Sequence, residues 1–513
     1  MTTLLTDNMP LLAGAPNGIK KLRELILELA VRGKLVAQDP SDEPASELLK
    51  HIAEEKSRLV AEGQVKKQKP LTDISEEEKP YDLPDSWAWV RLPEIYYPVS
   101  VSGNKLMSSQ ISEEGIFPVV DQGKRFIAGY TDDESLLIRL PGPVVVFGDH
   151  TTERKYVDFD FVAGADGVKI LRPVLLDEKF FWWHLVGLKL EGRGYARHFK
   201  VLNDTFFALP PKSEQSRIAA KIDELMALCD RLEAKQADAE SAHARMLQAL
   251  LDSLTQVSDA TDFAAGWQRL AEHFHTLFTT ESSIDTLKQS LRQLAVMGKL
   301  VSQDSTCTEL DGLPSGWRIQ KIDEFCSVQG GIQKTPLRRP VSQHFPYLRV
   351  ANVQRGCIDI KELERYELSL DELEKWRLNS GDLLIVEGNG SESEIGRCAI
   401  WYGEVKDCVY QNHLIRVRPK IAEEVGYLAL YLNSPVGMAH MKRLAITTSG
   451  LFNLSVGKIR SIPVGLPPLA EQYRIVAKVD QLMTLCDQLK TRLTRARQLN
   501  EQLASTLVEQ AVA

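Results

Sequence analysis

The longest repeated stretch of this sequence occurs at residues 209–232, which read LPPKSEQSRIAAKIDELMALCDRL, and again at residues 466–489, which read LPPLAEQYRIVAKVDQLMTLCDQL. The two copies are identical at 16 of 24 positions. Long self-similar segments are the sequence signature of a duplicated architecture. The repeat therefore predicts two half-molecules in tandem, and the rest of the chain can be placed around it.

Two shorter segments also occur twice, in the same order along the chain. They are LAVRGKLVAQD (29–39) with LAVMGKLVSQD (294–304), and LPDSW (83–87) with LPSGW (313–317). The stretches enclosed by these flanks, residues 88–208 and 318–465, show little resemblance to each other. We therefore predict two unlike modules on equivalent attachment points, as in a device that reads two different things.

A long helix is expected after each Leu-Pro-Pro, because the proline pair cannot continue a preceding helix but can open a new one. Apolar residues then recur in alternating steps of four and three, which is the pattern of a coiled-coil seam. The predicted seam contains Ile218, Ile222, Leu225, Cys229, Leu232, Ala239, Met246 and Leu250 in one copy and Ile475, Val479, Leu482, Cys486, Leu489, Leu493, Ala496, Leu503 and Leu507 in the other. Antiparallel pairing of the two helices would put equivalent modules at opposite ends.

The predicted fold class is α+β, with two mixed α/β modules separated by long paired antiparallel coiled-coil helices and related by a pseudo-twofold internal repeat. The expected domains are an N-terminal helical arm and linker (1–82), the first module (83–210), a central helical region (211–312), the second module (313–467) and a C-terminal helical region (468–513). Each module is large enough to form its own core.

Composition excludes several classes of protein. The chain has 513 residues and a net charge of −8, which argues against a uniformly basic nucleic-acid coat but permits local basic faces. No run of 18 apolar residues and no signal-peptide pattern is visible, so we expect no membrane partner. The seven cysteines are scattered without a CxxC pair, which favours reduced thiols and a cytoplasmic location over a disulfide framework or a zinc site.

Catalytic and cofactor motifs are weak. Gly-Lys occurs four times, but never within a phosphate-binding GxxxxGK[ST] loop, and Gly388-x-Gly390 is followed by acidic residues that would repel a pyrophosphate. The segment from Gly148 to Thr152 contains Asp149 and His150, as an acid–base or metal site might, yet no second ligand cluster accompanies it. We therefore interpret it as a shaped loop, and we expect no catalytic residue and no metal site in this chain.

Basic and amide side chains make the modules candidates for nucleic-acid binding. Residues 313–467 contain 20 Lys and Arg against 17 Asp and Glu, whereas residues 81–210 contain 14 against 18, so basic character there is confined to patches. Arg, Lys, Asn and Gln read base edges, and Lys and Arg also contact phosphates. The candidates are Lys124, Arg125, Arg154, Lys155, Arg193, Arg197 and Lys200 in the first module, and Lys334, Arg338, Arg339, Arg349, Arg355, Gln411, Asn412, Arg416, Lys442 and Arg443 in the second. Taken singly, each also fits a solvated surface charge.

The arrangement of motifs resembles the specificity (S) subunit of type I restriction–modification systems. Leu-Pro-x-x-Trp opens each module, and Leu-Pro-Pro-x-x-Glu-Gln-x-Arg-Ile followed by a long heptad helix closes it. The resemblance covers nearly the whole chain and implies two target-recognition domains, each reading one half of an asymmetric bipartite DNA site. The stretches between Asp39 and Leu83 and between Gln256 and Thr280 depart from it and suggest a longer-format subgroup.

The same resemblance implies which partners and cofactors to expect. Double-stranded DNA would bind the modules, and two modification (methyltransferase) subunits and the restriction (endonuclease and translocase) subunits would dock on the helices. S-adenosylmethionine, ATP and Mg²⁺ would belong to those partners, and this chain would bind no cofactor. The repeated polar residues mark either subunit docking or the junction of module and helix: Glu214, Gln215, Arg217, Glu471, Gln472 and Arg474.

Two rival functions stay open at this point. An enzyme that itself modifies DNA is disfavoured, because the Pro-Pro pairs follow leucines and not the Asn or Asp of an adenine methyltransferase motif. A scaffold that carries two modules for ligands other than DNA would suit the acidic total charge.

Overall fold

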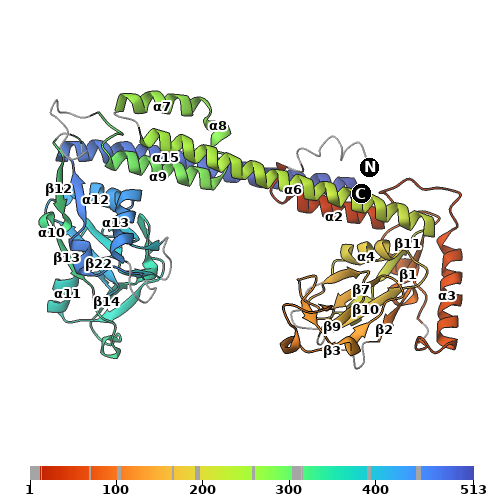
Figure 1. Cartoon of the computed structure of the whole chain (residues 1–513). Helices are drawn as coiled ribbons and strands as arrows, with labels where there is room; N and C mark the ends of the chain where they lie inside the picture. The colour runs from red at the N-terminus through yellow and green to blue at the C-terminus, as the bar shows by residue number, and fades with distance from the viewer. Residues whose placement is uncertain are drawn as a thin grey trace. The chain divides into compact units, whose positions relative to one another are not determined.

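The structure is a computed structural model and describes residues 12, 14–68, 71–100, 105–164, 167–190, 197–256, 260–302, 314, 316–389, 394–445 and 452–512. Contacts between residues divide the chain into two compact units: unit 1 contains residues 1–238 and 497–513, and unit 2 contains residues 239–496. The long helices α6 (Lys212–Thr255) and α15 (Leu469–Val512) each contribute one end to each unit (Figure 1). Every helix in the described part of the chain is too short or too polar to span a bilayer.

Unit 1 contains two main sheets. The first is antiparallel with the strand order β2-β10-β7-β8, and the second has the order β3-β9-β4-β5, with β6 paired to β9. A separate ribbon joins β1 to β11. The strands are β1 (Ala88–Arg91), β2 (Tyr96–Val99), β3 (Lys105–Leu106), β4 (Phe117–Val120), β5 (Gly129–Thr131), β6 (Leu137–Ile138), β7 (Val144–Gly148), β8 (Arg154–Val157), β9 (Phe161–Gly164), β10 (Val168–Pro173) and β11 (Phe206–Leu209).

Among its described residues, unit 1 contains four α-helices of its own, and α4 packs on the first sheet. They are α2 (Gly18–Val31), α3 (Ala45–Ala61), α4 (Glu178–Gly187) and α5 (Phe199–Asn203), beside the N-terminal part of α6 and the C-terminal end of α15. The carboxylate of Asp177 accepts a hydrogen bond from the Phe180 backbone N–H and so caps α4. Because Phe180 and Phe181 are fully buried with Val145 and Phe147 of β7, α4 forms the core layer between sheet and helices.

Unit 2 contains an antiparallel sheet with the strand order β13-β22-β18-β20, a three-stranded sheet with the order β17-β14-β21, and the ribbons β12–β24, β15–β16 and β19–β23. The strands are β12 (Arg318–Lys321), β13 (Cys326–Gly330), β14 (His344–Leu348), β15 (Val353–Gln354), β16 (Cys357–Ile358), β17 (Glu364–Glu367), β18 (Asp382–Val386), β19 (Gly388–Asn389), β20 (Cys398–Trp401), β21 (Val409–Tyr410), β22 (Leu414–Pro419), β23 (Phe452–Asn453) and β24 (Pro463–Leu466).

The helices of unit 2 accompany the C-terminal end of α6 and the N-terminal part of α15. They are α7 (Ala260–Glu272), α8 (Phe274–Leu277), α9 (Glu281–Val296), α10 (Ile322–Phe325), α11 (Leu370–Trp376), α12 (Val425–Leu432), α13 (Pro435–Ala445) and α14 (Val456–Arg460). One apolar core joins α9, α12, α13 and α15 to the β13-β22-β18-β20 sheet. The stretch between Gln256 and Thr280, which departs from the repeat, contains α7 and α8.

The two modules share a strand topology that their sequences did not reveal. The order β2-β10-β7-β8 in unit 1 matches β13-β22-β18-β20 in unit 2, and every neighbouring pair is antiparallel in both. Similarly, β4 lies antiparallel to β5 and parallel to β9, as β14 does to β17 and β21. Our expectation of unlike modules is therefore wrong for the framework, because strand topology depends on the pattern of burial more than on residue identity.

The predicted helix seam matches the buried positions at the start of each long helix but not at the end. Ile218, Ile222 and Cys229 are buried in unit 1, and the equivalent residues of α15 are buried in unit 2. In the last turns of α6, however, Leu247, Leu251 and Leu254 are buried, whereas Met246 and Leu250 are exposed. The predicted seam is wrong there by one position, because α7, α8 and α9 cover a different face of the helix.

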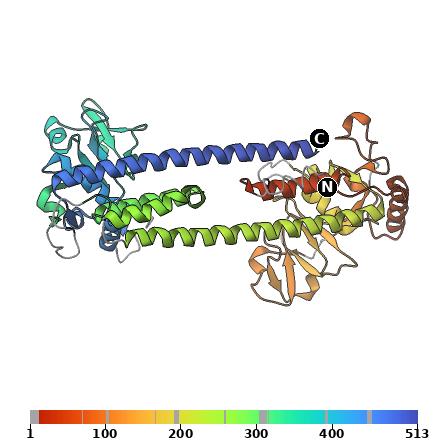
Figure 2. The same cartoon turned by 90° about the horizontal axis from the view of Figure 1, so that it is seen from above.

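A short helix packs against both long helices in each unit. In unit 1, α2 lies alongside α6 and α15 (Figure 2). Arg23 of α2 forms ion pairs with Asp230 and Glu233 of α6 at 2.6 and 2.7 Å, and Lys21 donates to Ser505 of α15 at 2.6 Å. Each of these partners lies within unit 1. The polar contacts therefore orient α2 relative to the two long helices of its own unit.

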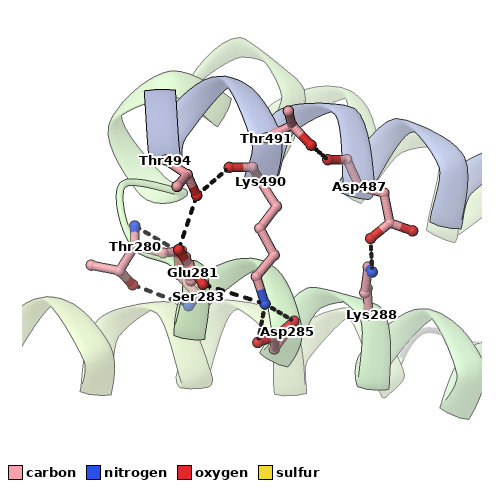
Figure 3. Close-up of polar contacts among 9 residues, drawn as sticks. All are labelled: Thr280, Glu281, Ser283, Asp285, Lys288, Asp487, Lys490, Thr491 and Thr494. Atoms are coloured by element: carbon pink, nitrogen blue, oxygen red, sulfur yellow. Dashed lines mark hydrogen bonds and ion pairs between the residues drawn. The ribbon is translucent and has the colours of Figure 1, made fainter. Parts of the chain in front are cut away.

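The equivalent contacts of unit 2 have partly reversed charges (Figure 3). Lys288 of α9 pairs with Asp487 of α15, and in the repeat these two residues correspond to Arg23 and Asp230. A second pair joins Lys490 to Asp285 at 2.9 Å, and Thr494 donates to Glu281 at 2.9 Å. In unit 1 the residues corresponding to Lys490 and Asp285 are Glu233 and Lys20, so the signs are exchanged between the two halves.

Candidate nucleic-acid interface

The repeated motifs meet at one buried hydrogen bond in each unit. The indole Nε1 of Trp87 donates to the carboxylate of Glu214 at 2.9 Å, and that of Trp317 donates to Glu471 at 3.0 Å. Beside this bond the first and last strands of each module pair with each other, β1 with β11 and β12 with β24. Each module is therefore attached by both of its ends to the start of a long helix.

The repeated Glu-Gln residues belong to this junction. Glu214, Gln215, Glu471 and Gln472 are all less than 5% exposed, and burial raises the pKa of Glu214. The amide nitrogens of Gln215 and Gln472 donate at 3.0 Å to the first proline carbonyl of their own Leu-Pro-Pro motif. Such buried groups offer no surface to a partner subunit, so their contacts support the junction role that the sequence left open.

The two arginines that follow are more accessible. Arg217 lies at the surface and forms an ion pair with Asp42 at 2.5 Å, a contact that lowers the pKa of the aspartate. Arg474 is half-buried in unit 2. The ion pair ties α6 to the turn before α3, so Arg217 also acts within the junction.

In the first module, four of the predicted basic residues are exposed on, or directly after, loops that pack together. The Asp149 carbonyl accepts a hydrogen bond from the His198 N–H at 2.8 Å, and its carboxylate accepts one from the Phe199 N–H at 2.7 Å. The hydroxyl of Thr151 donates to the Gln122 carbonyl at 2.5 Å. The three joined loops carry exposed Lys124, Arg125 and Arg197, and exposed Lys200 lies on α5 directly after the third loop, whereas Arg193 lies outside the described residues.

These contacts also account for the segment from Gly148 to Thr152. Asp149 is 4% exposed and its carboxylate accepts the Phe199 N–H, so it serves as a loop anchor. Across the ranges that the structure describes, no group of three or more His, Cys, Asp or Glu side chains is arranged to hold a metal ion. The geometry gives this loop a structural task.

Two predicted DNA contacts of the first module point inward. Lys155 is 6% exposed, and its ammonium is surrounded by backbone carbonyls of the loop after β4. Arg154 is half-buried, donates to the Leu188 carbonyl at 3.0 Å, and has its pKa lowered by burial. The prediction of direct DNA contact is therefore wrong for Lys155, because an ammonium held by carbonyls inside the protein cannot reach a base.

In the second module, several predicted basic residues are paired with carboxylates. Glu364 receives Lys334 at 3.3 Å and Arg349 at 3.1 Å, and Glu372 receives Arg338 at 2.9 Å. These pairs fix the direction of the side chains at a partly exposed surface. Arg339, Lys442 and Arg443 are exposed, and Arg355 is half-buried with a 3.3 Å hydrogen bond to Asn433.

Gln411 and Asn412 lie on a loop that is packed against its neighbour. The Gln411 N–H donates to Leu348 and the Asn412 N–H donates to Ile332, both at 2.9 Å, and both side chains remain half-buried. A β-carbon on Gly331 would lie 2.2 Å from the Gln411 carbonyl oxygen, so only glycine fits there. The backbone of Gln411 and Asn412 is thus held between the end of β14 and the segment after β13.

Arg416 is also misassigned as a DNA contact. It is 7% exposed, donates to the Gln329 side chain and lies 5.8 Å from the Tyr410 ring centroid. It lies on β22, where every residue except Arg418 is buried. Its guanidinium therefore stabilises the interior of the second module.

Comparison with known proteins decides the family. The profile of the type I restriction modification DNA specificity domain matches residues 314–498. The chain is 32% identical to the type I restriction enzyme EcoEI specificity subunit of Escherichia coli and 31% identical to the EcoAI specificity subunit of the same species. Each alignment covers 96% of this chain and 94% of the relative. This chain belongs to the family of type I restriction enzyme specificity subunits.

A solved chain from a study of complex assembly and conformational transition of the type I R-M system is 18% identical to this specificity subunit. The alignment covers 84% of this chain and 99% of that chain, with a TM-score of 0.46. The family identity rests on the two sequence relatives, and as a specificity subunit the chain is not the catalytic part of a restriction enzyme.

The sequence did not reveal the residues that organise the loops of this specificity subunit. Trp87 and Trp317 were recognised as repeated, but not as partners of Glu214 and Glu471. Asn352, which is 4% exposed and bonds to the carbonyls of Asp359 and Glu362, gave no sequence signal at all. The Phe-Pro pair shared by β4 and β14 was the available sign that the two modules correspond.

Proposed function

We propose that this specificity subunit selects the double-stranded DNA target of a type I restriction–modification enzyme, with each module reading one half of an asymmetric bipartite site. The proposal rests on the observation that the two modules share one strand framework but present different loops. Both modules have the same strand order, but their loops differ: exposed Lys124 and Arg125 follow β4 in the first module, whereas half-buried Gln411 and Asn412 follow β21 at the same edge of the matching sheet in the second. A shared strand framework places the loops of both modules in the same way. Different side chains on those loops would then select different bases.

The long helices set the distance between the two half-sites. In this proposal α6 and α15 pair in antiparallel sense as a coiled-coil spacer. The path of the chain supports it, since α6 begins in unit 1 and ends in unit 2 whereas α15 begins in unit 2 and ends in unit 1. A spacer of fixed length tests the DNA geometrically, because one base pair changes both the separation and the rotational phase of the half-sites.

Two modification subunits and the restriction subunits dock on the helices. Exposed apolar side chains support this, because patches of this kind mark protein–protein contacts. Met246 and Leu250 of unit 2 and Leu499 and Leu503 of unit 1 are 40–57% exposed, and Met246 and Leu503 occupy equivalent positions of the repeat. We assign S-adenosylmethionine, ATP and Mg²⁺ to those partners and place the complex in the cytoplasm.

Methylome sequencing tests the proposal. The chain is expressed with its modification subunit in a host that lacks other methyltransferases. We expect a split, asymmetric N6-methyladenine motif that disappears when the specificity subunit is omitted. Adenine methylation that persists without this chain, or a motif with no gap, would contradict the proposal.

A module exchange separates the two half-sites. Replacing residues 318–465 with the corresponding module of another specificity subunit should change one half of the motif and leave the other intact. A change in both halves would show that the modules do not read DNA independently. The shared attachment by Trp317 and Glu471 makes the exchange feasible without altering α15.

A further inference from the structure

A buried lysine closes the loop that carries the exposed basic pair of the first module. The loop spans residues 121–126 after β4 and exposes Lys124 and Arg125. The Lys155 ammonium, on β8 of the other sheet, donates to the carbonyl of Asp121 at 2.9 Å, to that of Arg125 at 2.5 Å and to that of Phe126 at 3.4 Å. One side chain thus joins the first residue of the loop to its last two.

The chemistry of this contact needs an ammonium group. A lysine carries three N–H donors and no acceptor, so a single nitrogen can satisfy several carbonyls that converge on it. Asp121 also places a carboxylate oxygen 3.3 Å from Lys155, and this charge opposes the desolvation that lowers the pKa of the lysine. Burial of an ammonium is unfavourable without such partners, and its presence here indicates a specific task.

The rest of the loop is fixed by close packing. A β-carbon at Gly164 would lie 2.6 Å from the Asp121 β-carbon, and one at Gly167 would lie 2.4 Å from the side-chain oxygen of Gln122. The same Gln122 oxygen accepts the His150 N–H at 3.2 Å. The base of the loop therefore rests against two strands, and only its tip faces solvent.

The tip is free to bind a ligand. Neither the Lys124 nor the Arg125 side chain has a hydrogen bond or an ion pair within the described ranges, and the neighbouring Phe126 is 47% exposed. Two unpaired cations on a rigid loop suit a polyanion, because a loop fixed before binding loses less conformational entropy on binding.

We infer that Lys155 is a positioning residue for DNA recognition by the first module: it presets loop 121–126 so that Lys124 and Arg125 contact one half-site. The inference rests on the proposed function. It replaces the direct contact that the sequence suggested for Lys155 with an indirect one.

The second module offers an internal comparison. Counting strand register back from the Arg-Pro pair that ends β10 and β22 places Ala399 where the first module has Lys155. There the segment after β14 is closed by Asn352, whose side-chain oxygen accepts the Arg349 N–H at 2.8 Å. Removal of Lys155 should therefore affect one half-site only.

The test compares Lys155→Met with Lys179→Met in the full chain expressed with its modification subunit. Lys179 is an exposed lysine on α4 of the same module, and it forms an ion pair with Asp223 of α6. Methylome sequencing of Lys155→Met should show at least a tenfold drop in methylation of the cognate site and relaxed sequence in one half of the motif. The other half should stay strict, and Lys179→Met should match the wild type within twofold.

Folding is checked by hydrogen exchange of β7 and β10. If Lys155→Met loses protection there, Asp121→Ala decides instead, because it removes one acceptor of the lysine and leaves the strands intact. Relaxation of the same half-site supports the inference. Strict recognition of both half-sites by a folded variant overturns it, whereas a wild-type chain without a split motif overturns the proposed function and not this inference.

Discussion

The two modules of this specificity subunit differ in how they use buried polar groups on one framework. In the first, a lysine reaches across from the neighbouring sheet to close the loop after β4; in the second, an asparagine within the segment after β14 does so. The sheets and the Trp–Glu junctions are equivalent. The difference teaches that the duplicated part of the chain fixes where a loop is presented, while single buried residues fix its shape.

The largest expected effect tests whether the junctions are equivalent. Trp87→Ala removes a buried indole and its bond to Glu214, and it should destabilise unit 1 by about 3–5 kcal/mol, the usual range for an aromatic deleted from a core. Trp317→Ala should do the same to unit 2. Hydrogen exchange resolved by peptide measures each unit in the same sample. Loss of protection in both units from either variant would show that the halves fold together.

A second prediction concerns the ion pair between Asp382 and Arg418 of the second module. Asp382, which is fully buried, accepts the Arg418 guanidinium at 2.5 and 2.7 Å, whereas the equivalent position in the first module is Val144. Because the Arg418 side chain is 33% exposed, the charge left behind can still be hydrated, and the loss of the two charge-assisted hydrogen bonds should destabilise by about 1.5–3 kcal/mol. Asp382→Asn should therefore lower the stability of unit 2, as measured by denaturant unfolding.

The matched variant Val144→Ile in unit 1 serves as its control, because it keeps an apolar side chain at the same register position. If Asp382→Asn leaves unit 2 as stable as the wild type, the ion pair does not contribute to its core.

The third prediction separates the modules by pH. Burial against Phe207 lowers the pKa of His184 in α4 to about 3, whereas α12 of the second module presents Tyr431, whose pKa burial raises to about 12. In the unfolded chain the His184 imidazole binds a proton near pH 6.5, whereas in the folded chain it stays neutral until about pH 3. With respect to this group, the folded state is therefore most stable above pH 6.5, and its free energy of unfolding decreases as the pH falls below that value. At pH 5 the loss should be about 2 kcal/mol for unit 1.

Hydrogen exchange at pH 7 and pH 5, corrected for the intrinsic rate, measures this loss. His184→Phe should remove the difference between the two pH values in unit 1. The stability change of unit 2 between pH 7 and pH 5 should be the same in the wild type and in His184→Phe. An equal loss of stability at pH 5 in unit 1 with and without the histidine would contradict the assignment.

The smallest expected effect concerns the reversed charges of the helix contacts. Lys490→Glu places a carboxylate beside Asp285 and Glu281 and should destabilise unit 2 by about 0.5–1 kcal/mol, since these groups are partly exposed. Adding Asp285→Lys should recover most of the loss. Thermal unfolding at low and high salt measures both variants. An effect that does not shrink with salt would not be electrostatic.

Much of the fold was predictable from the sequence because it is duplicated. The repeat indicated two attachment points, two long helices and a module in each half, and the segments that carry Trp87, Glu214 and their copies do form one junction. The predicted seam matches the buried positions at the start of α6 and of α15. At the end of α6, Leu247 is buried in place of Met246, because α7, α8 and α9 pack on another face of the helix. The periodicity of α6 alone does not show from which side those helices pack.

The candidate site shows the limit of sequence reasoning more sharply. The DNA contacts were predicted from side-chain type, yet Lys155 and Arg416 lie inside the protein while Lys124 and Arg125 face solvent. A lysine or arginine in a strand gives the same sequence signal whether its charged group is exposed to water or buried against backbone carbonyls.

The sequence by itself determined the family, the duplication and the chemistry available to each module, because these depend on residue identity and order. Only the tertiary structure revealed that the modules share one strand order and which lysine and arginine side chains are exposed and so accessible to DNA. The physical reason is that burial depends on neighbours brought from distant parts of the chain. For Lys155 those neighbours are the carbonyls of a loop that begins more than thirty residues earlier.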